Sequence, residues 1–86
     1  MSSEAQVRDL LQQALSPDTL IVKDVSDGCG AKFDVVVVSR QFDGVPLVER
    51  HRMVQSGLGD TMRAIHALSI KAWTAEQWQA KRKLYE

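Results

Sequence analysis

The first apolar pattern along the chain has helical spacing. Apolar side chains recur at i, i+3, i+4, i+7 and i+8, at Val7, Leu10, Leu11, Ala14 and Leu15. This spacing places them on one face and predicts an amphipathic helix from Glu4 to Leu15. Ser3 followed by Gln6 forms a capping-box pair at its start, and Pro17 ends it.

The next pattern has the composition of two strands. Residues 20–25 are rich in β-branched side chains, and residues 32–39 contain four consecutive valines. The sequence Ser-Asp-Gly-Cys-Gly at residues 26–30 separates them and is typical of a turn, so we expect a hairpin. Because residues 35–38 are apolar on both faces, the second strand should be central and covered by helices on at least one side.

Helical segments follow. Pro46 opens a predicted helix that continues to about residue 56, where Gly57 and Gly59 interrupt it before a short helical segment at residues 60–65. The pair Gly57 and Gly59 is a weak match to a phosphate-binding loop, because neither a third glycine nor a lysine follows. A break in the helix explains both glycines.

Alternation of apolar and polar residues returns at residues 67–73 and predicts a third strand. Thr74 followed by Gln77 forms a second capping-box pair and predicts a terminal helix. The element order is therefore α-β-β-α-α-β-α. We expect one α/β domain over residues 1–86, with a three-stranded mixed sheet and with helices packed on one face.

Composition and charge narrow the class of protein. Hydrophobic residues make up 44% of the 86 residues and charged residues 26%, which is ordinary for an ordered domain. The formal net charge is zero, so there is no global electrostatic case for nucleic acid or an anionic membrane. Residues 1–45 carry seven acids and four bases, and residues 46–86 carry four acids and seven bases. The second half offers either a basic surface for a partner or ordinary solvated helix faces.

The single cysteine, Cys29, excludes an internal disulfide and any four-cysteine metal site made from one chain. The first residues do not have the pattern of a signal peptide, and no apolar run approaches the roughly 20 residues that span a bilayer. We therefore expect a cytosolic protein without a membrane segment.

Two residues could act as metal ligands. Cys29 lies between two glycines, where its thiol could serve as a ligand or could be an incidental surface group. His66 falls where a predicted helix ends and a strand begins, from which an imidazole can reach solvent. His66 also shares parity with Leu68 and Ile70, which is typical of a partly buried structural residue. Both interpretations stay open at this point.

Arg50, His51 and Arg52 form a basic triplet in the predicted second helix. Its arginines could contact phosphate or pair with acids of the same domain. His51 is interpreted as a surface or capping residue, because two flanking cations disfavour a bound metal cation.

Three segments carry a resemblance to a known family. They are F-D-G-V-P-L-V-E-R-H-R-M-V at residues 42–54, I-H-A-L-S-I-K at residues 65–71 and T-A-E-Q-W at residues 74–78. With them, nearly the whole chain resembles the BolA family. The turn that contains Cys29 resembles the cytosolic and nuclear eukaryotic branch, since other branches commonly place a histidine in that loop.

The resemblance implies a fold similar to class II KH domains and a non-enzymatic role in iron–sulfur cluster assembly, delivery or iron signalling. The implied partner is a monothiol glutaredoxin, which supplies a cysteine and a glutathione thiolate to a bridging 2Fe-2S cluster. Cys29 and His66 then occupy the positions of the metal ligands on this chain. Arg50, His51, Arg52 and Lys71 are the residues we predict to bind the partner.

Elementary coordination chemistry agrees with the resemblance on one point. One cysteine and one imidazole can complete only one iron of a 2Fe-2S cluster, so a second chain must complete the other. That chain is the glutaredoxin or, as the alternative, a second copy of this protein. The implied locations are the cytoplasm and the nucleus.

A KH-like fold also suggests a rival function, namely nucleic-acid binding or transcriptional regulation. The G-x-x-G clamp of KH domains is absent, since Gly57 and Gly59 are one residue too close. A neutral chain without obvious stacking aromatics in that loop argues further against this function.

Overall fold

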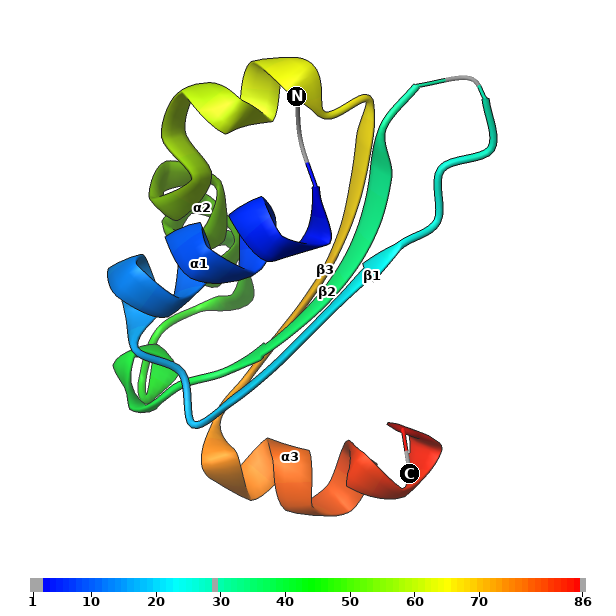
Figure 1. Ribbon diagram of the computed structural model, residues 1–86. Helices are drawn as coiled ribbons and strands as arrows, with labels where there is room; N and C mark the ends of the chain where they lie inside the picture. Colours follow the sequence, from blue (N-terminus) through cyan, green and yellow to red (C-terminus); the bar gives the residue numbers. More distant parts are fainter. Residues whose placement is uncertain (1–2, 29, 86) are drawn as a thin grey trace.

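The elements of the computed structural model follow the predicted order, and residues 3–28 and 30–85 are described (Figure 1). They are α1 (Glu4–Leu15), β1 (Thr19–Asp24), β2 (Lys32–Val38), the 3₁₀ turn η1 (Arg40–Phe42), α2 (Leu47–Leu58), the 3₁₀ helix η2 (Gly59–Ala64), β3 (Ala67–Trp73), α3 (Ala75–Lys81) and the 3₁₀ turn η3 (Arg82–Tyr85). Each predicted strand boundary lies within one residue of the observed one. The α/β class is confirmed.

The three strands form one mixed sheet in the order β1-β2-β3. β1 and β2 are antiparallel, with Val22 opposite Val35. β2 and β3 are parallel, with Lys32 opposite Ala67. The prediction that the valine-rich strand is central is therefore confirmed.

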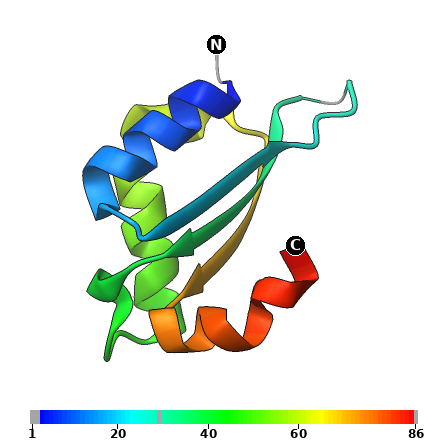
Figure 2. The ribbon, with the colours of Figure 1, turned by 60° about the horizontal axis from the view of Figure 1, so that its bottom comes forward.

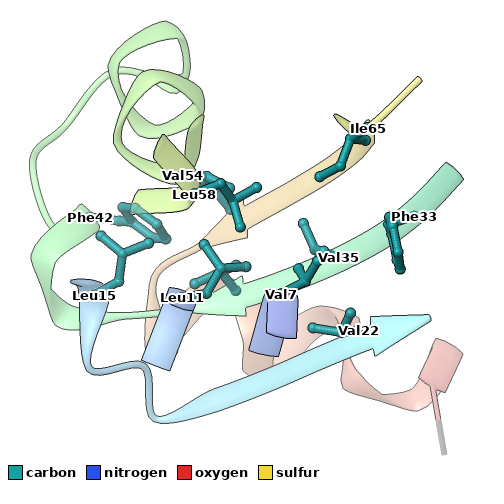
Figure 3. Close-up of a cluster of buried hydrophobic side chains, with 12 residues drawn as sticks. Val7, Leu11, Leu15, Val22, Phe33, Val35, Phe42, Val54, Leu58 and Ile65 are labelled. Carbon is teal, nitrogen blue, oxygen red and sulfur yellow. The ribbon is translucent and has the colours of Figure 1, made fainter. Parts of the chain in front are cut away.

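The hydrophobic core lies between the sheet and the pair α1 and α2. Side chains from the sheet and from both helices meet there, as Figure 3 shows. The buried members of this cluster are Val7, Leu11, Leu15, Val22, Phe33, Val35, Val37, Phe42, Val54, Leu58, Ile65 and Ala72. The helical period of α1 and the alternation of the strands both direct their apolar positions into this layer.

The third helix departs from the expectation that the helices share one face. Figures 1 and 2 show α3 on the side of the sheet away from α1 and α2. Because side chains alternate along β3, Trp73 points to the sheet face opposite that of its buried neighbour Ala72. The Trp73 ring lies 6.0 Å from the ring of Trp78 and 5.9 Å from that of Tyr85, measured between centroids. The terminal helix thus covers the aromatic residue that ends β3.

The helix after Pro46 also differs from its prediction. α2 continues to Leu58, and Gly57 lies inside it instead of interrupting it. A Cβ atom at Gly57 would lie 2.8 Å from the Cβ of Ala14, so the missing side chain lets α1 and α2 approach closely. Gly59 ends the helix with a φ of 54°. The segment predicted at residues 60–65 is a 3₁₀ helix, η2.

Candidate metal centre and partner surface

The loop between β1 and β2 is fastened at its base. The backbone N–H of Val25 donates to the carbonyl of Lys32 at 2.8 Å, and the N–H of Lys32 donates to Ser26 Oγ at 2.9 Å. The Lys32 ammonium pairs with Asp27 at 3.0 Å. These contacts hold the two ends of the loop together beside the end of the sheet.

Asp24 closes the strand that enters this loop. Hydrogen bonds from Ser26 hold the pKa of the Asp24 carboxyl below its ordinary value. The side chain of Ser26 contributes most to this lowering, and its backbone N–H contributes the rest. The backbone N–H of Asp24 donates to Glu4 Oε2 at 2.9 Å. The start of α1 therefore fixes the end of β1.

The register of the sheet brings His66 to this loop. Because Lys32 lies opposite Ala67 in a parallel pair, the residues before each of them are also neighbours. The N–H groups of His66 and Ala67 both donate to the carbonyl of Ala31, at 2.7 and 3.2 Å. The start of β3 and the β1–β2 loop consequently share one end of the sheet.

His66 itself is exposed and packs against Gly30. A Cβ atom built on Gly30 would lie 2.9 Å from His66 Cβ and 3.2 Å from His66 Cγ. Among residues 3–28 and 30–85, the imidazole has no hydrogen-bond or ion-pair partner. The structure therefore places His66 on the surface, and the interpretation of His66 as a partly buried structural residue is not supported.

Cys29, the other predicted ligand, lies outside the described residues. Its neighbour in the sequence is Gly30, which contacts His66. Within the described part of the chain, no group of three His, Cys, Asp or Glu side chains could hold a metal ion together. His66 is thus the described member of the predicted ligand pair.

Arg50, predicted as a partner contact, is directed into the domain. The residue is only 7% exposed. Nε donates to the carbonyl of Val45 at 2.7 Å, and Nη1 donates to the carbonyl of Ala72 at 3.1 Å and to Gln77 Oε1 at 2.8 Å. Arg50 therefore joins the start of α2 to the end of β3 and to α3, and it offers little surface to a partner.

The remaining partner-binding predictions fall on separate surfaces. His51 is half-buried, and exposed Arg52 pairs with Glu49 at 2.7 Å. The contact of neighbouring Arg50 with Ala72 places this turn of α2 near the far end of β3, and Ala72 is itself roughly 20 Å from His66 at the usual rise per residue of a strand. Lys71 is exposed and lies opposite Val36, on the sheet face away from α1 and α2. The four residues do not form one patch.

Sequence reasoning missed two contacts made by the predicted site residues. The packing of Gly30 on His66 has a signal in the sequence, since a glycine in a turn often marks a close approach of backbone to a neighbour. The inward direction of Arg50 has a weaker signal, its four-residue spacing from buried Val54 and eight-residue spacing from buried Leu58 on one helix face. Both depend on segments that are distant in the sequence.

Comparison with known proteins identifies the family. The sequence profile described as "BolA-like protein" matches residues 11–77. "Protein BOLA2" of Arabidopsis thaliana is 51% identical over 80 residues, covering 92% of this chain and 86% of that protein. "BolA-like protein 2" of Mus musculus is 38% identical over 78 residues, covering 90% of this chain and 91% of that protein.

A solved structure agrees with this match. A bol-like protein from Babesia bovis superposes with a TM-score of 0.89 at 43% identity, covering 95% of each chain. No helix among the described residues is long and apolar enough to cross a membrane. On the family profile, the relatives and the shared fold, the chain belongs to the BolA family.

Proposed function

We propose that this protein is an iron–sulfur adaptor and not an enzyme. In this proposal it binds a monothiol glutaredoxin in the cytoplasm and nucleus and shares a bridging 2Fe-2S cluster with it. The observation that carries the proposal is the packing of exposed His66 on Gly30, the residue next to Cys29 in the sequence. This contact brings the imidazole to the loop that contains the only thiol of the chain.

The donor set suits a cluster that two chains share. Each iron of a 2Fe-2S cluster takes two protein ligands beside its bridging sulfides, and histidine can replace cysteine on one iron. Cys29 and His66 would complete that iron, and the partner's cysteine and a glutathione thiolate would complete the other. The free imidazole of His66 supports this role, because ligation would break no hydrogen bond within the described residues.

The exposed cations would then contact the partner beyond the cluster. Arg52 belongs to the turn of α2 that contacts the far end of β3 from His66, so it would meet the partner at the edge of the interface. Lys71 belongs to the other sheet face and would meet a different part of the partner. Acidic side chains or the carboxylates of glutathione are the groups that these cations would attract.

Co-expression with a monothiol glutaredoxin tests the proposal. We expect the purified pair to carry one 2Fe-2S cluster, with visible absorption and circular dichroism that differ from those of the glutaredoxin alone. The isolated chain should be colourless and mostly monomeric, since it supplies ligands for one iron only. A colourless pair that still associates would contradict the cluster role. A stable cluster in the isolated monomer would contradict the sharing.

A further inference from the structure

The contact between Gly30 and His66 is closer than an ordinary side chain would permit. The atom nearest to a Cβ at Gly30 is the Cβ of His66, at 2.9 Å, and the ring atom Cγ follows at 3.2 Å. Nδ1 of the same ring lies at 3.7 Å. The near part of the histidine side chain, and not a flexible far end, therefore occupies the space that a side chain at residue 30 would need.

Hydrogen bonds hold the backbone next to this contact. The carbonyl of Ala31 accepts hydrogen bonds from the N–H groups of His66 and Ala67. These bonds tie His66 to the residue after Gly30, and rotation of the imidazole moves Cγ and Nδ1 but not Cβ, so a side chain at residue 30 must displace the loop backbone and press on the ring. Gly30 also has a φ of 121°, a backbone conformation that residues other than glycine rarely adopt.

We propose that Gly30 is a positioning residue for His66. Its missing side chain lets the loop backbone lie directly on the base of the imidazole, and this contact limits the directions in which the ring nitrogens can point. For iron ligation the inference rests on the function proposed above. The packing itself belongs to the protein without any cluster and can be measured there.

A matched pair of variants tests the positioning role. Gly30→Ala introduces a side chain against His66, whereas Gly28→Ala introduces one with no atom within 4 Å. Gly28 also has a positive φ, 91°, so both variants carry a backbone penalty of the same kind. A difference between them at the His66 ring therefore reports the contact with His66, which only residue 30 makes. Thermal melting of both variants checks that the domain stays folded.

The first measurement uses the isolated protein and nuclear magnetic resonance of its histidine rings. Gly30→Ala should shift the His66 ring signals and leave those of His51 unchanged, and Gly28→Ala should leave both close to wild type. The second measurement uses the complex with glutaredoxin. Gly30→Ala should speed the loss of the cluster by about 10-fold or more relative to Gly28→Ala, because disturbing the orientation of a metal ligand commonly lowers metal affinity by this factor.

The outcomes separate this inference from the proposed function. Equal ring signals and equal cluster lifetimes in the two glycine variants would overturn the positioning role. Equal lifetimes despite a shifted His66 ring would also overturn it for iron. A cluster that persists unchanged in His66→Ala would instead overturn the ligand role of His66, while the ring signals would still decide whether Gly30 orients it.

Discussion

Arg50 brings a positive charge into the domain and is satisfied there by neutral oxygens. Its hydrogen-bond acceptors are the carbonyls of Val45 and Ala72 and the side-chain carbonyl of Gln77. Gln77 Oε1 also accepts the N–H of Thr74, so the guanidinium and the cap of α3 share one acceptor. Burying such a charge costs free energy unless its N–H donors are hydrogen-bonded. Arg50 can therefore be buried only where these acceptors surround it.

Arg50→Ala should therefore destabilise the domain by about 2–4 kcal/mol, because it leaves these acceptors without their charged donor. Chemical denaturation measures the loss. Arg52→Ala is the control: its ion pair with Glu49 has side chains 68% and 53% exposed and should contribute less than about 1 kcal/mol. Similar unfolding midpoints for the two variants would show that Arg50 has no structural role.

Asp24 supplies a pH-dependent contact at the entrance of the loop. Its folded-state pKa is lowered from 3.8 by Ser26, so its contribution to stability is present above that pH and is lost as the pH falls through the folded-state pKa. Ser26→Ala should raise the pKa of Asp24 toward 3.8 in a carboxyl titration followed by nuclear magnetic resonance. Ser56→Ala, an exposed serine of α2, should leave it unchanged. An unaltered Asp24 titration in Ser26→Ala would refute this origin of the shift.

At the same scale, residue type indicated which residues are candidate ligands, but the sequence did not predict what surrounds them. A lone thiol and a histidine at a helix-to-strand junction stood out, and the resemblance to the BolA family paired them. Alternation nevertheless grouped His66 with Leu68 and Ile70, although it lies before β3 at a bend where that pattern does not hold. The buried position of Arg50 had only a weak signal, its helical spacing from Val54 and Leu58, because the acceptors that hold it lie on β3 and α3.

At the scale of elements, the packing of α1 on α2 depends on one glycine. Gly57 appeared from the sequence to break a helix, since glycine has a low helix propensity. Its position against Ala14 gives it a packing role that propensity does not reveal. The periodic elements themselves were predictable within one or two residues, because their apolar spacing is set by the face that each one buries.

Gly57→Ala tests this packing against helix propensity. Alanine favours a helix by about 1 kcal/mol, but a Cβ at 2.8 Å from Ala14 should cost about 1–3 kcal/mol through overpacking. We expect a net loss of stability in chemical denaturation. Adding Ala14→Gly should recover part of the loss, as a positive coupling in a double-mutant cycle. A Gly57→Ala protein more stable than wild type would argue against close packing at this point.

At the scale of the whole molecule, the sheet register unites the candidate site. The parallel pairing of β2 with β3 places the end of the β1–β2 loop beside the residue that precedes β3, although 36 positions separate Gly30 from His66. The sequence predicted a mixed sheet with a central valine-rich strand, and such a sheet allows the β1–β2 loop and the start of β3 to lie side by side. It did not predict α3 on the opposite face, because the stacking of Trp73 with Trp78 depends on the direction in which the chain leaves the sheet.

The most direct measurement compares the two histidines in the complex with a monothiol glutaredoxin. His66→Ala and His51→Ala are each co-expressed with the partner, and the visible absorption, circular dichroism and lifetime of the cluster are recorded. We predict that His66→Ala changes the spectrum and shortens the lifetime, while His51→Ala, on the turn of α2 that contacts the far end of β3, leaves both unchanged. A changed spectrum in His51→Ala beside an unchanged one in His66→Ala would contradict the assignment of His66 as an iron ligand.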